Sequence, residues 1–140
     1  MADHVSDLRA AIDAWNAHDV ERYVASYTPD AALHGFPPPI IDPASLGEFF
    51  AGFWAAVPDA HVELDDAFGD GGEQVASRLT MTGTQAGTLM GMPASHRFFE
   101  IGVMSIFRFT DDGRIAARWN VADFLSMLQQ IGAVPAPAPA

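Results

Sequence analysis

The stretch "RIAARWNVADFLSMLQQIGA", residues 114–133, decides the fold. Its first half is rich in aliphatic and aromatic residues, which half-buried strands favour. Its second half, from Phe124 to about Ile131, is typical of a short helix, with Gly132 as its natural stop. The stretch therefore predicts a last strand that runs directly into a closing helix.

The residues before this stretch predict further strands. Apolar and polar residues alternate after Pro58, the "GDGG" of residues 69–72 is a hairpin signal, and residues 73–87 continue the alternation. A loop rich in Gly, Met and Pro follows, and residues 97–109 are again rich in aromatic and aliphatic residues. The turn "TDDG" at residues 110–113 then leads into the last strand.

The residues before Pro58 predict three helices and one short strand. Val5, Leu8, Ile12 and Trp15 keep helical spacing and predict a first helix. Asp19 is placed to cap a second, shorter helix that ends at Pro29, with one face formed by Val20, Tyr23, Val24 and Tyr27. "AALHGF", residues 31–36, allows a short strand. Asp42-Pro43 predicts the start of a third helix that closes at Pro58.

This order of elements predicts the α+β class. Helices come first, then a meander of long antiparallel strands, then a short helix, without the regular strand–helix alternation of a parallel sheet. We expect helices on one face of a curved sheet. Residues 1–133 form a single domain in this prediction, and the Ala/Pro-rich residues 134–140 form an extended, disordered tail.

Composition and charge exclude several classes of function. The 140 residues carry 7 basic and 18 acidic side chains, a formal net charge of -11, which disfavours nucleic acid and anionic membrane surfaces as partners. No cysteine is present, and the five histidines lack metal-ligand spacing, so we expect no metal site. No secretory signal and no apolar run long enough to span a bilayer is visible, so a cytoplasmic location is the default expectation.

Asp123 is the main candidate for chemistry, and two interpretations stay open. In regular alternation it shares a face with Ile115, Ala117, Trp119 and Val121, while Arg118 and Asn120 point the other way. A carboxylate on an apolar face loses hydration and becomes a better proton acceptor near neutral pH. Alternatively, Asp123 caps the helix that begins at Phe124.

Further candidates follow from residue type and position. His34, close to Phe36, is a candidate acid/base or orienting group, or else a structural histidine. Arg78 lies mid-strand on the less apolar side and either faces solvent or holds an acidic side chain or a substrate carbonyl. Large apolar side chains are expected in the core, and some of them must line any pocket. The candidate substrate-binding residues are Trp15, Tyr27, Phe36, Phe53, Arg78, Met104 and Trp119.

Four stretches together resemble the SnoaL-like polyketide cyclases, also called ester cyclases, of the nuclear-transport-factor-2-like superfamily. They are "DAWNAHDVERYVASYTPDAALHG" (13–35), "VASRLTMTGTQAG" (75–87), "MGMPASHRFFEIGVMSIFRFTDDGRI" (90–115) and "ARWNVADFLSMLQQIGA" (117–133). The last is the most specific, with Trp119, Asp123 and "LQQIG" in the family's order. The resemblance implies a cone-shaped barrel around an apolar pocket, usually dimeric through the outer sheet face.

The resemblance also implies an activity. Members close a ring of a polyketide ester by an intramolecular aldol reaction without metal or organic cofactor, and the family's acid/base aspartate falls on Asp123. The family's histidine on a neighbouring strand has no counterpart in residues 97–109, so His34 is the candidate for the second acid/base group. The expected partner is a hydrophobic small molecule. Isomerase, dehydratase and epoxide hydrolase activities of the same fold stay open, as does a non-catalytic binding module.

Overall fold

The computed structural model describes residues 3–136, which form helices α1 to α4 and strands β1 to β5. The elements follow one another in the order α1 (His4–Asn16), α2 (Val20–Ala25), β1 (Tyr27–His34), α3 (Pro43–Ala56), β2 (His61–Gly69), β3 (Gln74–Thr84), β4 (Phe98–Phe109), β5 (Ile115–Ala122) and α4 (Phe124–Gln130). The predicted α+β cone is confirmed. Residues 137–140 of the predicted tail lie outside the described residues, so the predicted domain boundary stays a prediction.

The five strands form one sheet in the order β1-β5-β4-β3-β2. Neighbours from β2 to β5 are antiparallel, but β1 pairs with β5 in parallel, so the prediction of a wholly antiparallel sheet was wrong at this edge. The chain reaches β1 from α2 and continues into α3 before the rest of the sheet is built. No short hairpin links β1 to β5, so the connection between them does not require antiparallel pairing. The sheet is curved but not closed, with β1 and β2 as its two edges.

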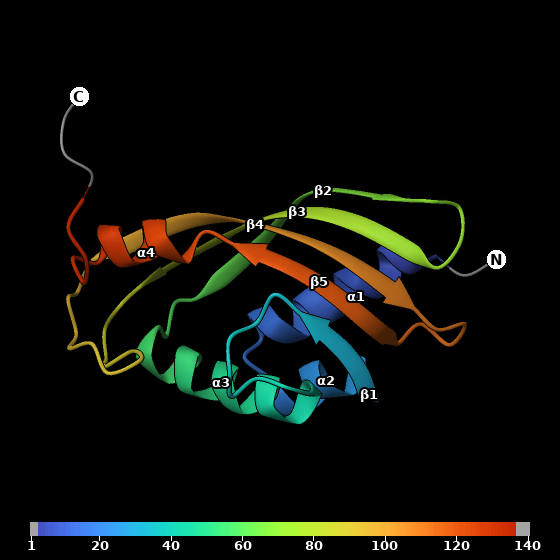
Figure 1. Cartoon of the computed structure of the whole chain (residues 1–140), viewed down its shortest axis with the longest axis horizontal. Helices are drawn as coiled ribbons and strands as arrows, with labels where there is room; N and C mark the ends of the chain where they lie inside the picture. The colour runs from blue at the N-terminus through green and yellow to red at the C-terminus, as the bar shows by residue number, and fades with distance from the viewer. Residues whose placement is uncertain (1–2, 137–140) are drawn as a thin grey trace.

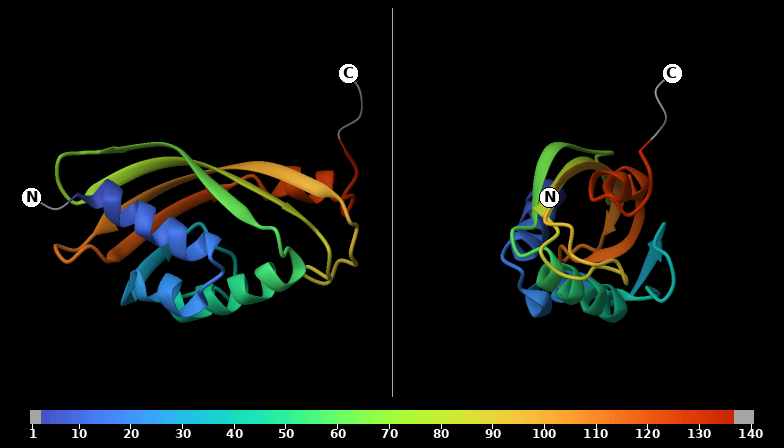
Figure 2. Two further views of the ribbon diagram at one scale, coloured as in Figure 1. Left: turned by 180° about the vertical axis from the view of Figure 1, so that it is seen from behind. Right: turned by 90° about the vertical axis from the view of Figure 1, so that its left-hand side faces the viewer.

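Three helices cover one face of this sheet. Figure 1 shows α1, α2 and α3 below the sheet, with the opposite face of β3, β4 and β5 uncovered, and Figure 2 shows the sheet curving over the helices. The predicted caps are present, because Asp19 accepts from the backbone N–H of Arg22 and Asp42 accepts from that of Ser45. Helix α4 follows β5 at one end of the sheet and contacts β4.

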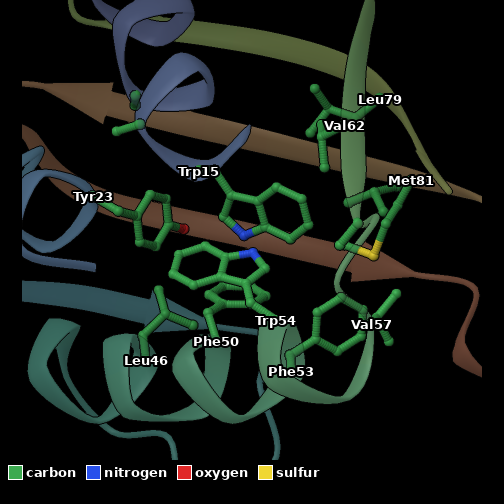
Figure 3. Close-up of a cluster of buried hydrophobic side chains, with 14 of the residues drawn as sticks. Trp15, Tyr23, Leu46, Phe50, Phe53, Trp54, Val57, Val62, Leu79 and Met81 are labelled. Carbon is green, nitrogen blue, oxygen red and sulfur yellow. The ribbon is translucent and has the colours of Figure 1, made fainter. Parts of the chain in front are cut away.

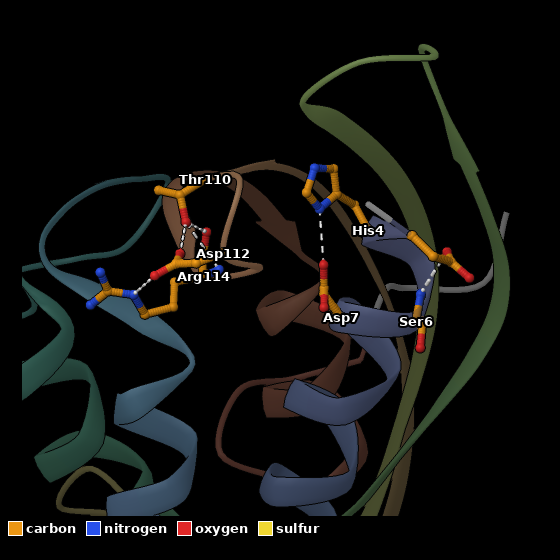
Figure 4. Close-up of polar contacts among 7 residues, drawn as sticks. His4, Ser6, Asp7, Thr110, Asp112 and Arg114 are labelled. Carbon is orange, nitrogen blue, oxygen red and sulfur yellow. Dashed lines mark hydrogen bonds and ion pairs between the residues drawn. The ribbon is translucent and has the colours of Figure 1, made fainter. Parts of the chain in front are cut away.

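The opposite end of the molecule is held by short-range polar contacts (Figure 4). His4 Nδ1 lies 2.9 Å from Asp7 Oδ2 in the first turn of α1. In the turn between β4 and β5, the hydroxyl of Thr110 donates to Asp112, and Arg114 Nε donates to the same carboxylate over 3.1 Å. These contacts fix the start of the first helix and the entry to β5.

An aromatic cluster fills the space between α1, α3 and the sheet (Figure 3). The ring of Trp15 packs edge-on against Phe50 and Trp54, with centroids 5.5 and 5.6 Å apart. Phe53 is 2% exposed and packs against Phe99 of β4. Within residues 3–136, no helix has the length and apolar character needed to cross a membrane.

Tyr27 begins strand β1 rather than ending the second helix, as the sequence predicted. Helix α2 stops at Ala25, with Ser26 as its C-cap. Pro29 disfavours helical geometry at Thr28, the residue before it, so the chain leaves the helix earlier than the apolar spacing indicates. The side chain of Tyr27 is nevertheless buried, at 2% exposure.

The faces of β5 also differ from the prediction. The pairing of β4 with β5 shifts at Ala116, because Arg108 is opposite Ala117 but Phe109 is opposite Ile115. An extra residue of this kind, as in a β-bulge, reverses which side chains point inward beyond it. Ile115 is buried as predicted, and Ala117 is buried although it lies opposite the exposed Arg108. From Arg118 onward the faces are exchanged. The buried residues are Arg118 and Asn120, and the exposed ones are Trp119, Val121 and Asp123.

Candidate active site

Two cavities lie between the helices and the inner face of the sheet. The small cavity, of about 50 Å³, is lined by residues that include Trp15, Tyr23 and Tyr27. The large cavity, of about 220 Å³, is lined mostly by apolar side chains, among them Phe36, Phe49, Phe53, Met90, Phe124 and Leu128. Arg118 lines both cavities, as do Phe50, Met81 and Val103, so the two cavities are neighbours.

Arg118 is the centre of a buried polar cluster. Its Nη1 donates to the hydroxyls of Tyr23 (3.2 Å) and Tyr27 (2.9 Å). Its Nη2 donates to Ser105 Oγ (3.2 Å) and Asn120 Oδ1 (3.0 Å), and its Nε donates to Ser105 Oγ (3.3 Å). The two tyrosine hydroxyls lie 2.9 Å apart, and Ser105 Oγ donates to Asn120 Oδ1 over 2.9 Å. These five residues are called the Arg118 cluster below.

The fold brings the cluster together from four elements. Tyr23 comes from α2 and Tyr27 from β1, while Ser105 lies directly opposite Asn120 across the β4–β5 pairing. The shift at Ala116 turns the side chains of Arg118 and Asn120 inward. Gly35 allows the chain after β1 to approach closely, since a Cβ there would lie 1.9 Å from the backbone oxygen of Asn120.

The electrostatics of the cluster are unusual, because a buried cation is surrounded by neutral groups. Arg118 is 8% exposed, and in the described part of the chain no carboxylate forms an ion pair with it. The rings of Phe36 and Phe107 face its guanidinium at 5.3 and 4.8 Å, which offsets part of the lost hydration. Burial acts to lower the pKa of Arg118, but the neighbouring Tyr27 and Tyr23 raise it overall, so the side chain stays charged.

Tyr23 stays protonated in the same surroundings. Burial raises the pKa of its phenol well above the usual value, the neighbouring Tyr27 adds to this shift, and the positive charge of Arg118 opposes it. The hydroxyl is therefore a neutral hydrogen-bond donor throughout the physiological pH range.

The structure places Asp123 outside the cavities. Its side chain is exposed and accepts from the backbone N–H of Ser126 over 3.1 Å, as the N-cap of α4. The capping interpretation is thereby confirmed. Asp123 borders a shallow surface depression beside Arg78 and Met104, on the face of the sheet opposite the helices. Its catalytic role stays a prediction.

His34 also lies on the outer side. Its exposed ring stacks on Trp119 with centroids 5.2 Å apart, at an angle of 10°. Met104 and Trp119 are 62% and 41% exposed on that same face. Arg78 is exposed and lies 3.9 Å from a carboxylate oxygen of Asp65. The reversal of faces in β5 explains why Trp119 lies outside, and the regular alternation of β3 and β4 explains Arg78 and Met104.

Four predicted substrate-binding residues do line the cavities: Trp15 and Tyr27 the small one, Phe36 and Phe53 the large one. The sequence analysis did not identify Tyr23, Ser105, Arg118 and Asn120 as site residues. A sequence signal for Arg118 and Asn120 would have required knowledge of the shift at Ala116. Within residues 3–136, no group of three or more His, Cys, Asp or Glu side chains is arranged to hold a metal ion.

One protein family matches most of this sequence. The sequence pattern described as SnoaL-like polyketide cyclase matches residues 7–131. TsrD from Streptomyces laurentii is 26% identical with a TM-score of 0.83, over 96% of this chain and 100% of its own. IdmH from Streptomyces antibioticus, a candidate polyketide cyclase, is 28% identical with a TM-score of 0.80, over 94% and 99%.

A third solved structure is similar in fold. AclR from Streptomyces galilaeus, a candidate hydroxylase, is 23% identical with a TM-score of 0.84, over 99% of this chain and 86% of its own. The chain has no significant match among curated protein sequences.

The raised pKa of Tyr23 predicts a loss of stability in alkali. An unfolded tyrosine loses its proton near pH 10, while the buried phenol of Tyr23 holds its proton to a higher pH. The contribution to stability is therefore complete below about pH 10 and declines as the pH rises from there toward the folded-state pKa. Urea denaturation between pH 7 and pH 11 should show this decline, and Tyr23→Phe should reduce its slope. An equal slope in the variant would contradict the assignment to Tyr23.

The capping role of Asp123 can be tested separately from its negative charge. Asn caps a helix as well as Asp does, so Asp123→Asn should change the free energy of unfolding by less than about 0.5 kcal/mol, whereas Asp123→Ala should lower it by about 1 kcal/mol. Chemical denaturation of the three proteins measures both changes. If Asp123→Ala were as stable as the native chain, the hydrogen bond to Ser126 would not contribute.

Proposed function

The chain belongs to the SnoaL-like polyketide cyclase family, and from this premise we propose that it closes a ring in a hydrophobic polyketide-type ester by an intramolecular aldol reaction. In this proposal the substrate occupies the large cavity, and neither metal nor organic cofactor takes part. The observation that carries the proposal is the Arg118 cluster, a concentrated set of hydrogen-bond donors in an otherwise largely apolar interior.

The cavity supports ring closure through its shape. A flexible chain with several carbonyl groups rarely brings its two reacting carbons together in water. Apolar walls from α3, α4 and the sheet restrict the bound chain to few conformations, which makes the intramolecular step more probable. Exclusion of water also strengthens every electrostatic contact that the substrate makes with the cluster.

The cluster supports the chemistry through its charge. Removal of a proton between two carbonyl groups leaves an enolate, whose oxygen carries negative charge. The cation of Arg118 and the donors around it favour that charge. The enolate carbon then attacks a second carbonyl carbon, a carbon–carbon bond forms, and the new alkoxide takes up a proton. The proton that the alkoxide takes up is the one that the base, Asp123 in this proposal, removed from carbon, and Tyr23 or Tyr27 donates a hydrogen bond to the developing negative charge, because both hydroxyls lie in the interior beside Arg118.

Asp123 and His34 stay the predicted acid/base pair in this proposal. Both lie on the outer side, so action on a substrate in the large cavity requires the first turn of α4 to turn inward, or requires the reacting end of the substrate to extend past that turn. Asp123 directly follows Ala122, which does line the large cavity, so the distance to be covered is short.

A second candidate is proton transfer of the isomerase kind. Such a reaction needs a hydrogen-bond donor deep in the pocket that stabilises the enolate oxygen. The buried hydroxyl pair of Tyr23 and Tyr27 provides one.

A non-catalytic binding module is the third candidate, because the described residues that line the two cavities include no carboxylate and no imidazole.

The main proposal predicts a large effect at Arg118. Arg118→Met keeps an unbranched side chain but removes the charge and the donors, and should lower kcat/KM for a methyl-ester anthraquinone-type substrate by at least about 100-fold. Arg108→Met, an exposed change on β4, is the matched control and should stay within about twofold of the native chain. Unchanged turnover in Arg118→Met would refute the assigned role.

The same assay tests Asp123. Because Asp123→Asn keeps the cap, any loss of turnover in that variant reports on the carboxylate itself. A decrease of about 100-fold or more would support a catalytic base, which is the range of general acid/base effects. Turnover equal to that of the native chain would limit Asp123 to capping.

We also propose that the uncovered face of the sheet forms a homodimer. Met104 and Val121 lie opposite each other on β4 and β5, as do Ile106 and Trp119, and these side chains are 41% to 74% exposed. A continuous apolar surface of this kind favours association.

Val121→Glu should shift a dimer toward monomer in sedimentation velocity at micromolar concentration, because burial of an unpaired carboxylate is costly. Ile41→Glu, at an apolar position that is 76% exposed outside the sheet, is the control and should leave the dimer intact. A native chain that sediments as a monomer would contradict the proposal.

A further inference from the structure

Each hydrogen bond of the Arg118 cluster can be assigned a donor and an acceptor, because an arginine side chain only donates. The N–H groups of Arg118 make five hydrogen bonds, and every acceptor is a neutral oxygen, from Tyr23, Tyr27, Ser105 or Asn120. The positive charge is thus satisfied in hydrogen bonds but is not neutralised. Burial of such a charge destabilises the folded state unless an opposite charge lies close by.

The orientation of the Asn120 amide follows from this count. Its oxygen must face Arg118, because a guanidinium cannot accept a hydrogen bond, and the same oxygen also accepts from Ser105 Oγ. The amide nitrogen therefore points elsewhere. Among the residues that the structure describes, none accepts a hydrogen bond from it, and Asn120 lines the large cavity. Two N–H donors are thus left for a ligand.

The tyrosine pair leaves one more donor. Tyr23 and Tyr27 have one hydroxyl proton each, and one of these protons lies in the hydrogen bond between the two oxygens. The other proton finds no acceptor within residues 3–136. Since both oxygens also accept from Arg118, the free hydroxyl is polarised and becomes a stronger donor.

The cluster therefore presents the free N–H donors of Asn120 to the large cavity, next to one positive charge that no carboxylate neutralises among the described residues. We infer that the ligand of the large cavity binds as an anion, with a carboxylate or enolate oxygen of a flat hydrophobic acid held by the Asn120 amide beside the charge of Arg118. The free tyrosine hydroxyl lies on the side of the small cavity, which Tyr23 and Tyr27 line. This inference rests on the proposed function, in that the large cavity is the binding site, and it adds the chemical class of the bound group.

An anionic ligand also accounts for the absence of a carboxylate or imidazole among the described residues that line the two cavities. A compound that loses its acidic proton to water before it binds needs no base inside the cavity. Any carboxylate placed there would repel the ligand and neutralise Arg118. Among the described residues that line the two cavities, Arg118 is the one charged side chain, although the chain as a whole has a formal net charge of -11.

Matched acids and neutral analogues test the inference by calorimetry at pH 7.5. The first pair is 2-naphthoate and its neutral methyl ester. The second pair is 2-hydroxy-1,4-naphthoquinone, which is an ionised enol at this pH, and its neutral methyl ether. Each acid should bind the native chain at least about tenfold more tightly than its neutral partner, as expected for hydrogen bonds to a charged group. Binding of both acids indicates a general oxyanion site, and binding of one alone identifies carboxylate or enolate as the preferred source.

Two variants and a control locate the effect. Asn120→Asp is nearly isosteric and provides Arg118 with an internal counter-ion, so it should abolish the preference for the acids while the neutral analogues change by less than about threefold. Arg118→Met should abolish the same preference, and Arg108→Met should retain it. Equal affinity for acid and neutral partner in the native chain, binding of neither acid, or an unchanged preference in Asn120→Asp would overturn the inference.

The outcome is independent of turnover. Tight binding of the acids without any cyclisation would support the anion site and count against the proposed cyclase. Cyclisation of a neutral ester without preference for the acids would do the reverse.

Discussion

The hydrogen bonds of Arg118 are the interaction on which the interior of this protein depends. They join α2, β1, β4 and β5 at one point, through side chains that are far apart in the sequence. Removal of the guanidinium would leave hydroxyl and amide groups without partners in an apolar interior. The cluster thus fixes the edge strand β1 against β5 and also determines where the two cavities have their polar end. Arg118 thus stabilises the fold and is also central to the proposed function.

The shift at Ala116 is the second constraint, because it decides which residues of β5 share the interior. Regular alternation would have placed Trp119 and Val121 against the helices and Arg118 in solvent. The shift exchanges these faces, so the sheet has a polar group in its concave interior and an apolar outer surface. The inward Arg118 and the outward Trp119 and Val121 follow from one extra residue, while Met104 and Ile106 complete the outer surface from β4. In the proposals above, the inner polar group marks the ligand site and the apolar outer surface forms the dimer interface.

Much of the fold could be predicted from the sequence, since its signals are local. Asp42-Pro43 starts α3, Asp19 caps α2, and the alternation of Val75, Ser77, Leu79 and Met81 marks the inner face of β3, all as observed. The parallel pairing of β1 with β5 was not predictable in this way, because residues 31–36 contain no information about their distant partner.

The candidate site was harder to predict for the same reason. Ala116 and Ala117 are small and fit either a regular strand or a bulge, so nothing in the sequence marks the point where the faces exchange. An arginine in a strand is also expected to face solvent, and its burial depends on tyrosines about 90 residues earlier in the chain. Asp123, by contrast, was identified from the sequence, but its role was not. Its position before an apolar helix is equally typical of a cap and of a catalytic carboxylate, and only the structure shows the hydrogen bond to Ser126.

In the proposed reaction, the contribution of Arg118 depends on whether the substrate enters the cavity as an anion or as a neutral molecule. If the substrate enters as an enolate, the charge is already present in the bound ground state, so the cluster lowers KM while ring closure is accelerated mainly by the restricted conformation of the chain. If the substrate enters neutral and ionises inside, the charge develops within the cavity, and the same hydrogen bonds raise kcat. The cavity lining that the structure describes provides no base for the second route. Loss of Arg118 should therefore affect KM more than kcat, unless Asp123 reaches the cavity.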